Sequence, residues 1–552
     1  MSAPQRRPPG PRPPATRGSA SPARRRSPAL RVEDPVAGPD PAALAQRLTA
    51  IRHELLEASA GWQPWAEGRD PYRDASARNL LQYLALRRHD LRALQDPLLT
   101  LGVSSLGRSE GHVQATVDAV IDALTALSGS PAPPRVDDAP ITLSRSRGLL
   151  ASRTQELLGP GAPGRTTRIM VTMPTEAAQD GGLVLEMLLA GMNCMRINCA
   201  HDGPDEWQAM CENLRWAHAQ TNRRARIHVD LPGPKLRTGP VASQPARDGK
   251  GEHLRLSVGD RLTLVREGAR ARKQGDAQRT PRMCCSLPEA FAATRPGHHV
   301  WFDDGKIGGV VEAVDADSIE VAITAAKAKG AKLRPGKGIN LPDAVLEIDL
   351  LGAHSAEALA FAVARADIVG LSFVSHASEV KHVHTYLDGH GRPELGIVLK
   401  IETRRAFERL PGLLLAALAG GRPAGVMIAR GDLAVECGYE RLAEVQEEIL
   451  WLSEAAHMPV IWATEVLDRL ASTGRPSRAE ITDAAMGVRA ECVMLNKGPQ
   501  IADAIRVLDD ILRRMHQHQA KKRSLLRRLR ASDYTHTPPP AASARTPRAR
   551  VG

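Results

Sequence analysis

The segment Gly396-Ile397-Val398-Leu399-Lys400-Ile401-Glu402 decides the fold and the chemistry expected for this chain. Its apolar half predicts a buried strand that ends at a lysine and a glutamate. Glu402 is followed 28 residues later by Arg430-Gly431-Asp432, again directly after an apolar run, residues 425–429. If the two strands end side by side, Glu402 and Asp432 can hold a hard divalent cation such as Mg²⁺, and Lys400 and Arg430 can neutralise a phosphoryl group. The two segments together predict phosphoryl transfer.

Short apolar segments alternate with helical ones eight times after residue 165. The predicted strands are 168–172, 193–197, 225–230, 367–371, 396–401, 425–429, 459–463 and 491–495. Eight consecutive β/α units are typical of a (β/α)8 TIM barrel, an α/β fold whose active site lies at the C-terminal ends of the strands. Polar residues stand at nearly all of these ends: Arg196, Asn198, Asp230, Ser372, Lys400, Glu402, Arg430, Asp432, Thr464 and Asn496.

The spacing of the predicted strands is interrupted once, after the third strand. Residues 240–342 carry alternating β patterns with Gly and Pro punctuation and predict an inserted all-β cap domain, so that the barrel occupies 166–239 and 343–519. A cap at the mouth of a barrel can close over a substrate and exclude water. Before the barrel, residues 41–130 predict a small helical N-terminal domain, and the Pro-, Ser- and Gly-rich residues 131–165 predict a linker.

The net charge of +12 belongs to the two ends of the chain. Residues 1–32 and 521–552 together carry +16, which leaves −4 for residues 33–520. We therefore expect a disordered Arg- and Pro-rich tail at 1–40 and a disordered basic tail at 520–552. Because aromatic residues for base stacking are not interleaved with these charges, nucleic-acid binding by the tails is disfavoured.

Composition also indicates the compartment. No apolar run approaches the roughly 18 to 20 residues of a membrane helix, and the N-terminus lacks the apolar stretch of a secretory signal. The seven cysteines are odd in number and form no Cys-x-x-Cys pair, which argues against a disulfide framework and a zinc site. We expect a cytoplasmic protein with no membrane partner.

Residues 166–500 resemble the pyruvate kinase family. The matching motifs follow one another around the predicted barrel: Gly-Met-Asn-x-x-Arg-Ile-Asn at 191–198 with His201, Asp230 with 233–239, Asp-Asp-Gly-Lys-Ile at 303–307, 337–342, Leu-Ser-Phe-Val at 371–374, Lys-Ile-Glu at 400–402, Ala-Arg-Gly-Asp-Leu at 429–433, Ala-Thr at 463–464 and 475–480. The resemblance implies a glycolytic enzyme that uses Mg²⁺ (or Mn²⁺) to transfer a phosphoryl group from phosphoenolpyruvate to ADP, giving pyruvate and ATP.

The resemblance also implies roles for individual residues. Glu402 and Asp432 match the family's Mg²⁺ ligands, which also hold the carboxylate of phosphoenolpyruvate. Lys400 matches the lysine that stabilises the phosphoryl group in transit, and Arg196 matches the arginine that grips it. Thr464 matches the threonine near the methylene carbon, where a relayed proton turns enolpyruvate into pyruvate.

A second group of matches implies the nucleotide site. His201, Arg237 and Lys337 match residues at the ADP phosphates, and Gly431 lies with Asp432 in the substrate-binding motif. A homo-oligomer is also expected for a member of this family. After residue 500 the predicted helix at about 500–519 stands where the family continues into an effector-binding domain, so we expect no response to sugar phosphates.

Three departures fall at the rim where substrate and nucleotide are seated, and a fourth falls in the loop after the first strand. Asn496, Glu465 and Ser375 replace family residues at the rim of the barrel, and Met173-Pro174 has lost the family's glycine. Two alternatives therefore stay open: an enzyme on the same barrel that uses a related oxo-acid or a different acceptor, and a homologue that binds ligands without turnover. The intact set of lysine, arginine and two carboxylates disfavours the second.

The monovalent cation site also departs from the family. Asn198 and Asp230 match ligands of the family's K⁺, but Lys235 stands where potassium-dependent members carry a glutamate, and Ala200 replaces a serine ligand. An ammonium group at Lys235 could supply the positive charge of K⁺ and repel the cation. The alternative is that Lys235 points to solvent and the K⁺ site is simply weakened.

Overall fold

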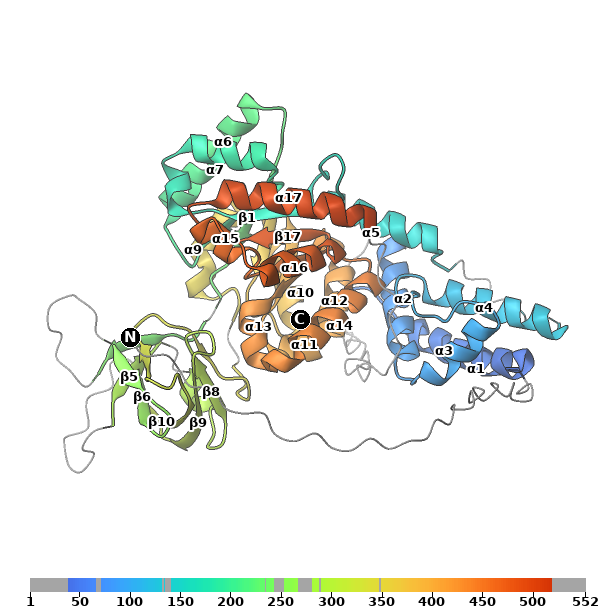
Figure 1. Cartoon of the computed structure of the whole chain (residues 1–552), viewed down its shortest axis with the longest axis horizontal. Helices are drawn as coiled ribbons and strands as arrows, with labels where there is room; N and C mark the ends of the chain where they lie inside the picture. Colours follow the sequence, from blue (N-terminus) through green and yellow to red (C-terminus); the bar gives the residue numbers. More distant parts are fainter. Residues whose placement is uncertain are drawn as a thin grey trace, which may run out of the picture.

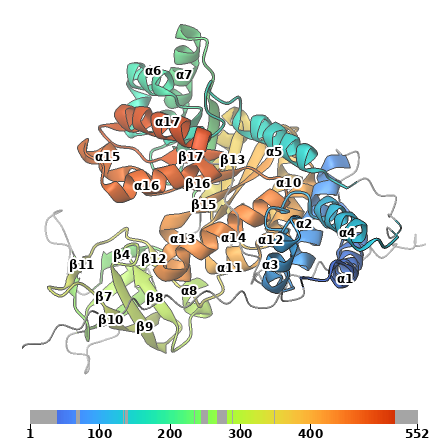
Figure 2. The same cartoon turned by 45° about the vertical axis from the view of Figure 1, so that its right-hand side comes forward.

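The fold is described from a computed structural model that covers residues 38–518, except 66–70, 132–133, 135–139, 234, 243–252, 267–279, 287–288 and 347–348. A barrel lies at the centre, with the β-rich insertion on one side and the N-terminal helices on the other (Figures 1 and 2). The predicted tails at 1–40 and 520–552 lie outside the described residues, apart from 38–40.

Eight parallel strands close into a barrel in the order β1-β17-β16-β15-β14-β13-β3-β2. Their bounds are β1 (Arg168–Thr172), β2 (Cys194–Asn198), β3 (Arg226–Asp230), β13 (Ile368–Leu371), β14 (Gly396–Ile401), β15 (Ala424–Ala429), β16 (Val460–Ala463) and β17 (Cys492–Leu495). The predicted (β/α)8 barrel is confirmed. Every residue of β14 and β15 is buried, as expected for parallel strands covered on both faces.

Helices surround the barrel between these strands. The longer ones are α6 (Gly181–Ala190), α7 (Pro204–Gln220), α9 (Ala356–Arg365), α10 (Ala377–Gly389), α12 (Leu410–Gly420), α14 (Leu442–Ala455), α16 (Arg478–Met486) and α17 (Ile501–His518). Local signals explain where several begin: at α16, Ser477 accepts a hydrogen bond from the Glu480 N–H, and the Glu480 carboxylate accepts one from the Ser477 N–H. Helix α12 is apolar on all sides because it lies between α10 and α2 (Pro71–Leu86).

Part of the predicted linker is a helix. Residues 143–158 form α5 (Leu143–Leu158), so the linker prediction for 131–165 is wrong there. Leu157 and Leu158 pack into the same apolar cluster as the interior residues Met170 and Val398 of the barrel. The strand glycine Gly396 makes room for this helix, since a Cβ there would lie 2.5 Å from Leu157 Cδ1. Because the segment is largely polar, the sequence analysis did not recognise that Leu157 and Leu158 pack into the interior of the barrel.

The insertion after β3 forms a seven-stranded sheet of order β12-β8-β9-β10-β6-β7-β4 and a two-stranded sheet of β11 and β5. The strands are β4 (Thr238–Val241), β5 (Leu254–Leu256), β6 (Arg261–Arg266), β7 (Arg282–Cys285), β8 (His299–Phe302), β9 (Ile307–Val314), β10 (Ser318–Ala325), β11 (Ala331–Leu333) and β12 (Ile339–Asn340). One short helix, α8 (Glu289–Ala293), accompanies them. The insertion has a hydrophobic core separate from that of the barrel.

The N-terminal helices share a hydrophobic core with the barrel. They are α1 (Pro41–Ala60), α2, α3 (Arg92–Thr100) and α4 (Val113–Ser128). Buried Asn79 of α2 joins the two parts, because its amide nitrogen donates to the carbonyl oxygens of Glu110 and Ala455, each at 2.8 Å. Among the described residues, no helix is long and apolar enough to cross a membrane.

Candidate active site

A cavity of about 400 Å³ opens at the C-terminal ends of the barrel strands. It is lined by ten of the residues singled out in the sequence: Arg196, Asn198, His201, Lys235, Arg237, Lys400, Glu402, Gly431, Asp432 and Thr464. The barrel explains this convergence, because parallel strands all end on the same rim. Asp230 lies beneath the cavity and is completely buried.

Asp230 is the centre of a buried network that contains two cations and a histidine. Its Oδ2 atom accepts a hydrogen bond from Arg196 Nε at 2.9 Å and lies 3.2 Å from Lys400 Nζ. Its Oδ1 atom lies 2.7 Å from Nε2 of His228. Burial opposes ionisation of this carboxylate, but Arg196 and Lys400 outweigh it and hold the pKa of Asp230 well below its usual range. A permanent negative charge therefore brings together the two cations predicted to act on a phosphoryl group.

Lys400 Nζ is held at the floor of the cavity by three neighbours. Besides Asp230, it lies 3.0 Å from Glu402 Oε1 and donates a hydrogen bond to Ser372 Oγ at 2.7 Å. Burial disfavours the charged amine, but Asp230 and Glu402 overcome this and raise the pKa of Lys400. Lys400 and Glu402 are two residues apart on one strand exit, so their side chains face the same way.

Glu402 and Asp432 are the two carboxylates that the sequence predicts as Mg²⁺ ligands. The Phe373 N–H donates to Glu402 Oε2 at 2.7 Å, whereas Asp432, in the first turn of α13 (Arg430–Cys437), lies 2.6 Å from Lys235 Nζ through its Oδ1 atom. Burial first, and then the charge of Asp432, raises the pKa of Glu402 despite the neighbouring Lys400. The negative charges of the two acids therefore repel each other across the cavity. A cation bound between them would reduce this repulsion.

This pair of carboxylates fits a magnesium ion. Within the described part of the chain, no group of three or more His, Cys, Asp or Glu side chains is placed to hold a metal. Mg²⁺ is usually bound through only one or two protein carboxylates, with substrate phosphates and water completing its octahedron. Glu402 and Asp432 supply that number of hard oxygen donors.

Strained backbone lies at the exits of two strands beside these acids. Phe373, Thr464 and Glu465 adopt positive φ angles of 59°, 64° and 56°, a region that non-glycine residues seldom occupy. The Thr464 hydroxyl accepts a hydrogen bond from the Gly431 N–H at 2.9 Å. Thr464 is thereby fixed to the strand exit that carries Asp432.

The predicted nucleotide residues lie toward the cap. Arg237 Nη1 donates to the Gly336 carbonyl at 3.0 Å, and Lys337 Nζ lies 3.0 Å from Asp303 Oδ1 in the cap. Partial burial, followed by the charges of Lys497 and Arg237, lowers the pKa of His201. Asn198 at the end of β2 accepts a hydrogen bond from the Ala200 N–H at 3.3 Å.

Arg430 does not face the cavity, and the expectation that it neutralises a phosphoryl group is wrong. Its guanidinium donates to the Ala463 carbonyl at 2.9 Å and pairs with Asp483, with 2.8 Å between Nη2 and Oδ2. The same group lies 4.7 Å from the centre of the Trp462 ring. Because Arg430 begins α13, its side chain turns away from the barrel axis while Asp432, two residues later, turns toward it.

Two of the departures from the family motifs, Glu465 and Asn496, line this cavity together with Asp468. Asn496 Nδ2 donates to Asp468 Oδ1 at 3.3 Å. Burial raises the pKa of Asp468, and the nearby Glu465 adds to the shift. Ser375 lies in a smaller adjoining cavity, together with Lys235 and Glu436.

Sequence reasoning missed two residues of this region, His228 and Glu436. His228 stands two positions before Asp230 on β3, and this spacing was the available signal, since alternate strand residues share a face. Glu436 lies one helical turn after Asp432 and accepts a hydrogen bond from Asn340 Nδ2 at 3.2 Å. Burial raises the pKa of Glu436 to about 7.

Comparison with known proteins finds one family along most of the barrel. The family described as "Pyruvate kinase, barrel domain" matches residues 164–500. The chain is 33% identical to a pyruvate kinase of Mycobacterium tuberculosis, 32% to one of Mycobacterium intracellulare and 31% to one of Thermococcus litoralis. These matches cover 58 to 61% of this chain and 63 to 66% of the relatives.

Proposed function

The chain belongs to the pyruvate kinase family, and on this premise we propose that it transfers a phosphoryl group from phosphoenolpyruvate to ADP. The departures at Asn496, Glu465 and Ser375 bear on substrate specificity and on the rate of turnover. The four groups on which transfer depends, Arg196, Lys400, Glu402 and Asp432, all line one cavity. This makes an enzyme the better proposal than a homologue that only binds.

One observation carries the proposal. Arg196 Nε and Lys400 Nζ lie 2.9 and 3.2 Å from the same oxygen, Oδ2 of Asp230. Two cations held by one buried carboxylate form a preorganised binding place for a group with several negative oxygens. A loose phosphoryl transition state needs such positioning and charge more than covalent chemistry.

Each of these residues would have a separate role in the phosphoryl transfer. Arg196 would hold the phosphoryl oxygens in the substrate, and Lys400 would stabilise the same oxygens as the bond to the leaving enolate breaks and the bond to the nucleotide forms. Glu402 and Asp432 would hold the divalent cation, which when bound supplies positive charge to the phosphoryl oxygens and the substrate carboxylate. The cap, through Arg237 and Lys337, would hold the nucleotide phosphates.

The second step is the protonation of the enolate. Thr464 lines the cavity with its hydroxyl fixed by the Gly431 N–H. A proton passed by water at this hydroxyl would form a C–H bond at the methylene carbon, while the C=C electrons supply that bond and the enolate oxygen becomes the ketone. Pyruvate is then the product.

The test is pyruvate formation, followed by NMR, from phosphoenolpyruvate and Mg²⁺ with a panel of nucleoside diphosphates. We expect pyruvate and a nucleoside triphosphate to appear in equal amounts with at least one diphosphate, and Lys400→Met to abolish most of the signal. Tight binding of phosphoenolpyruvate without pyruvate from any diphosphate would contradict the proposal and favour a different acceptor or a binding role.

A further inference from the structure

A histidine outside the predicted site supports the central carboxylate. His228 of β3 is completely buried, and its Nε2 atom lies 2.7 Å from Asp230 Oδ1. Because the other oxygen, Oδ2, contacts Arg196 and Lys400, each oxygen of Asp230 has its own set of partners. A carboxylate that accepts a hydrogen bond at one oxygen from a fixed donor cannot rotate about its Cβ–Cγ bond without losing that contact.

The neighbouring strand is shaped to accept this contact. Gly370 of β13 is paired in register with Asp230. A Cβ atom at Gly370 would lie 2.0 Å from Asp230 Oδ1 and 2.7 Å from His228 Nε2. No larger residue fits at position 370 while His228 and Asp230 keep their present positions.

The direction of the hydrogen bond follows from its surroundings. Asp230 accepts from Arg196 and is acceptor-only as a carboxylate, so His228 Nε2 carries the proton and donates it. The other ring nitrogen, Nδ1, is buried and has no hydrogen-bond partner among the described residues. This arrangement points to one use of the imidazole, which is to hold Asp230.

We propose that His228 is a positioning residue that fixes the plane of Asp230, so that Oδ2 draws Arg196 and Lys400 together for an incoming phosphoryl group. His228 itself does not line the cavity and acts through Asp230. This inference rests on the proposed function, because it concerns how the same site holds phosphoenolpyruvate. Gly370 is also required, because its lack of a Cβ atom leaves space for the contact between His228 and Asp230.

Two amide variants test the contact with matched chemistry. In His228→Gln the amide nitrogen can reach the position of Nε2, whereas in His228→Asn it is one methylene short. We expect His228→Asn to raise the KM for phosphoenolpyruvate about tenfold, the scale of a lost hydrogen bond to a charged group, while the KM for ADP stays the same. His228→Gln should recover most of the loss. A general structural defect would instead lower the fraction of active enzyme, and would not raise the KM for phosphoenolpyruvate while leaving the KM for ADP unchanged.

A variant on the other strand gives an independent reading. Gly370→Ala keeps His228 but places a methyl group against Asp230 Oδ1, so it should raise the KM for phosphoenolpyruvate and leave that for ADP unchanged. Equal effects of His228→Gln and His228→Asn, or a parallel rise in both KM values, would overturn the inference. So would an unchanged KM for phosphoenolpyruvate in Gly370→Ala.

Binding measurements separate this inference from the proposed function. If the wild-type protein forms no pyruvate, the proposed function fails, and calorimetric titration with phosphoenolpyruvate then tests His228 alone. The inference holds if His228→Asn binds about tenfold more weakly than wild type and His228→Gln does not. It is overturned if the variants bind alike, or if the wild-type protein does not bind phosphoenolpyruvate.

Discussion

The Nζ atom of Lys235 lies 2.6 Å from Oδ1 of Asp432. An ammonium group from the loop after β3 is thus paired with one of the two carboxylates expected to hold the divalent cation. Lys235 also lies 3.9 Å from Asp304 Oδ1 and is mostly buried. This lysine therefore does not point to solvent, and whether its charge takes the place of K⁺ stays a prediction.

The position of Lys235 predicts indifference to potassium. Because an ammonium group already stands in the mouth and would repel a second cation at close range, turnover should be nearly the same in sodium, potassium and tetramethylammonium buffers of equal ionic strength. Many-fold activation by K⁺ alone would contradict this.

Reversing the departures at Lys235 and Ala200 tests whether these two residues cause the expected indifference to K⁺. The double variant Lys235→Glu with Ala200→Ser restores the family's residues and should create activation by K⁺. The single variant Lys235→Met is the control, since it removes the charge without adding a ligand. It should lower turnover in all three buffers alike.

The transfer lysine is expected to dominate turnover. Lys400→Met removes the charge that contacts Asp230 and Glu402, and should lower turnover by about 10² to 10³, the scale of losing one preorganised charge at a transition state. Steady-state kinetics at saturating Mg²⁺ measure this. Lys332→Met, on the exposed face of β11, should leave turnover unchanged, and near wild-type turnover in Lys400→Met would reject the assignment.

The carboxylate pair should set the requirement for divalent metal. Removal of metal with EDTA should abolish transfer, and Asp432→Asn should raise the Mg²⁺ concentration for half-maximal activity by roughly tenfold or more, because one of two charged oxygen ligands is lost. Asp304→Asn is the matched control, since its carboxylate is exposed and near the same lysine. Equal Mg²⁺ requirements in the two variants would contradict the ligand assignment.

Glu436 should make stability depend on pH. Its pKa rises from 4.5 to about 7 on folding, so the native state binds more protons in this range and stability falls as pH rises. Urea unfolding of metal-free protein should show a loss on the order of 2 to 3 kcal/mol between pH 4.5 and 8 that is missing in Glu436→Gln. Substitution of the exposed Glu440 by Gln should not change the pH profile.

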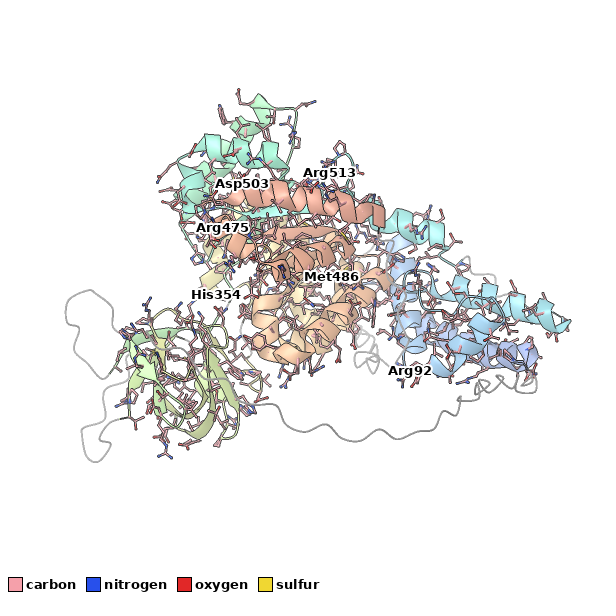
Figure 3. The ribbon with its side chains drawn as sticks, viewed as in Figure 1. Arg92, His354, Arg475, Met486, Asp503 and Arg513 are labelled. Atoms are coloured by element: carbon pink, nitrogen blue, oxygen red, sulfur yellow. The ribbon has the colours of Figure 1, made fainter. Side chains whose placement is uncertain are left out.

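Asn79 is expected to couple the N-terminal helices to the barrel. Its side chain makes three buried hydrogen bonds, to Glu110, Ala455 and the N–H of Val113. Asn79→Ala should therefore lower the free energy of unfolding by about 3 kcal/mol. Arg92→Ala is the control, because Arg92 lies exposed on the same group of helices (Figure 3). A change of less than about 0.5 kcal/mol in Asn79→Ala would show that this contact does not join the two parts.

The barrel could be predicted from the sequence because its signals are local. Apolar runs such as 396–401 and 425–429 are long enough to mark strands, and their regular recurrence fixes the α/β order. The rim residues followed directly, since the end of each run in the sequence is the end of each strand. Lys400, Glu402 and Asp432 were found in this way without any knowledge of the packing.

The tertiary structure decided which of these side chains meet. Arg430 and Asp432 both follow β15, yet the first binds Asp483 and the second faces Lys235, because the direction of a side chain depends on the helix that begins there. Leu157 of α5 fills the base of the barrel through space left by strand glycines. The support of Asp230 by His228 also depends on Gly370. This glycine lies 140 positions after Asp230 in the chain and is beside Asp230 only once the barrel has closed. Strand positions follow from local periodicity, whereas contacts between strands depend on register and on the space left by neighbours, which no local pattern encodes.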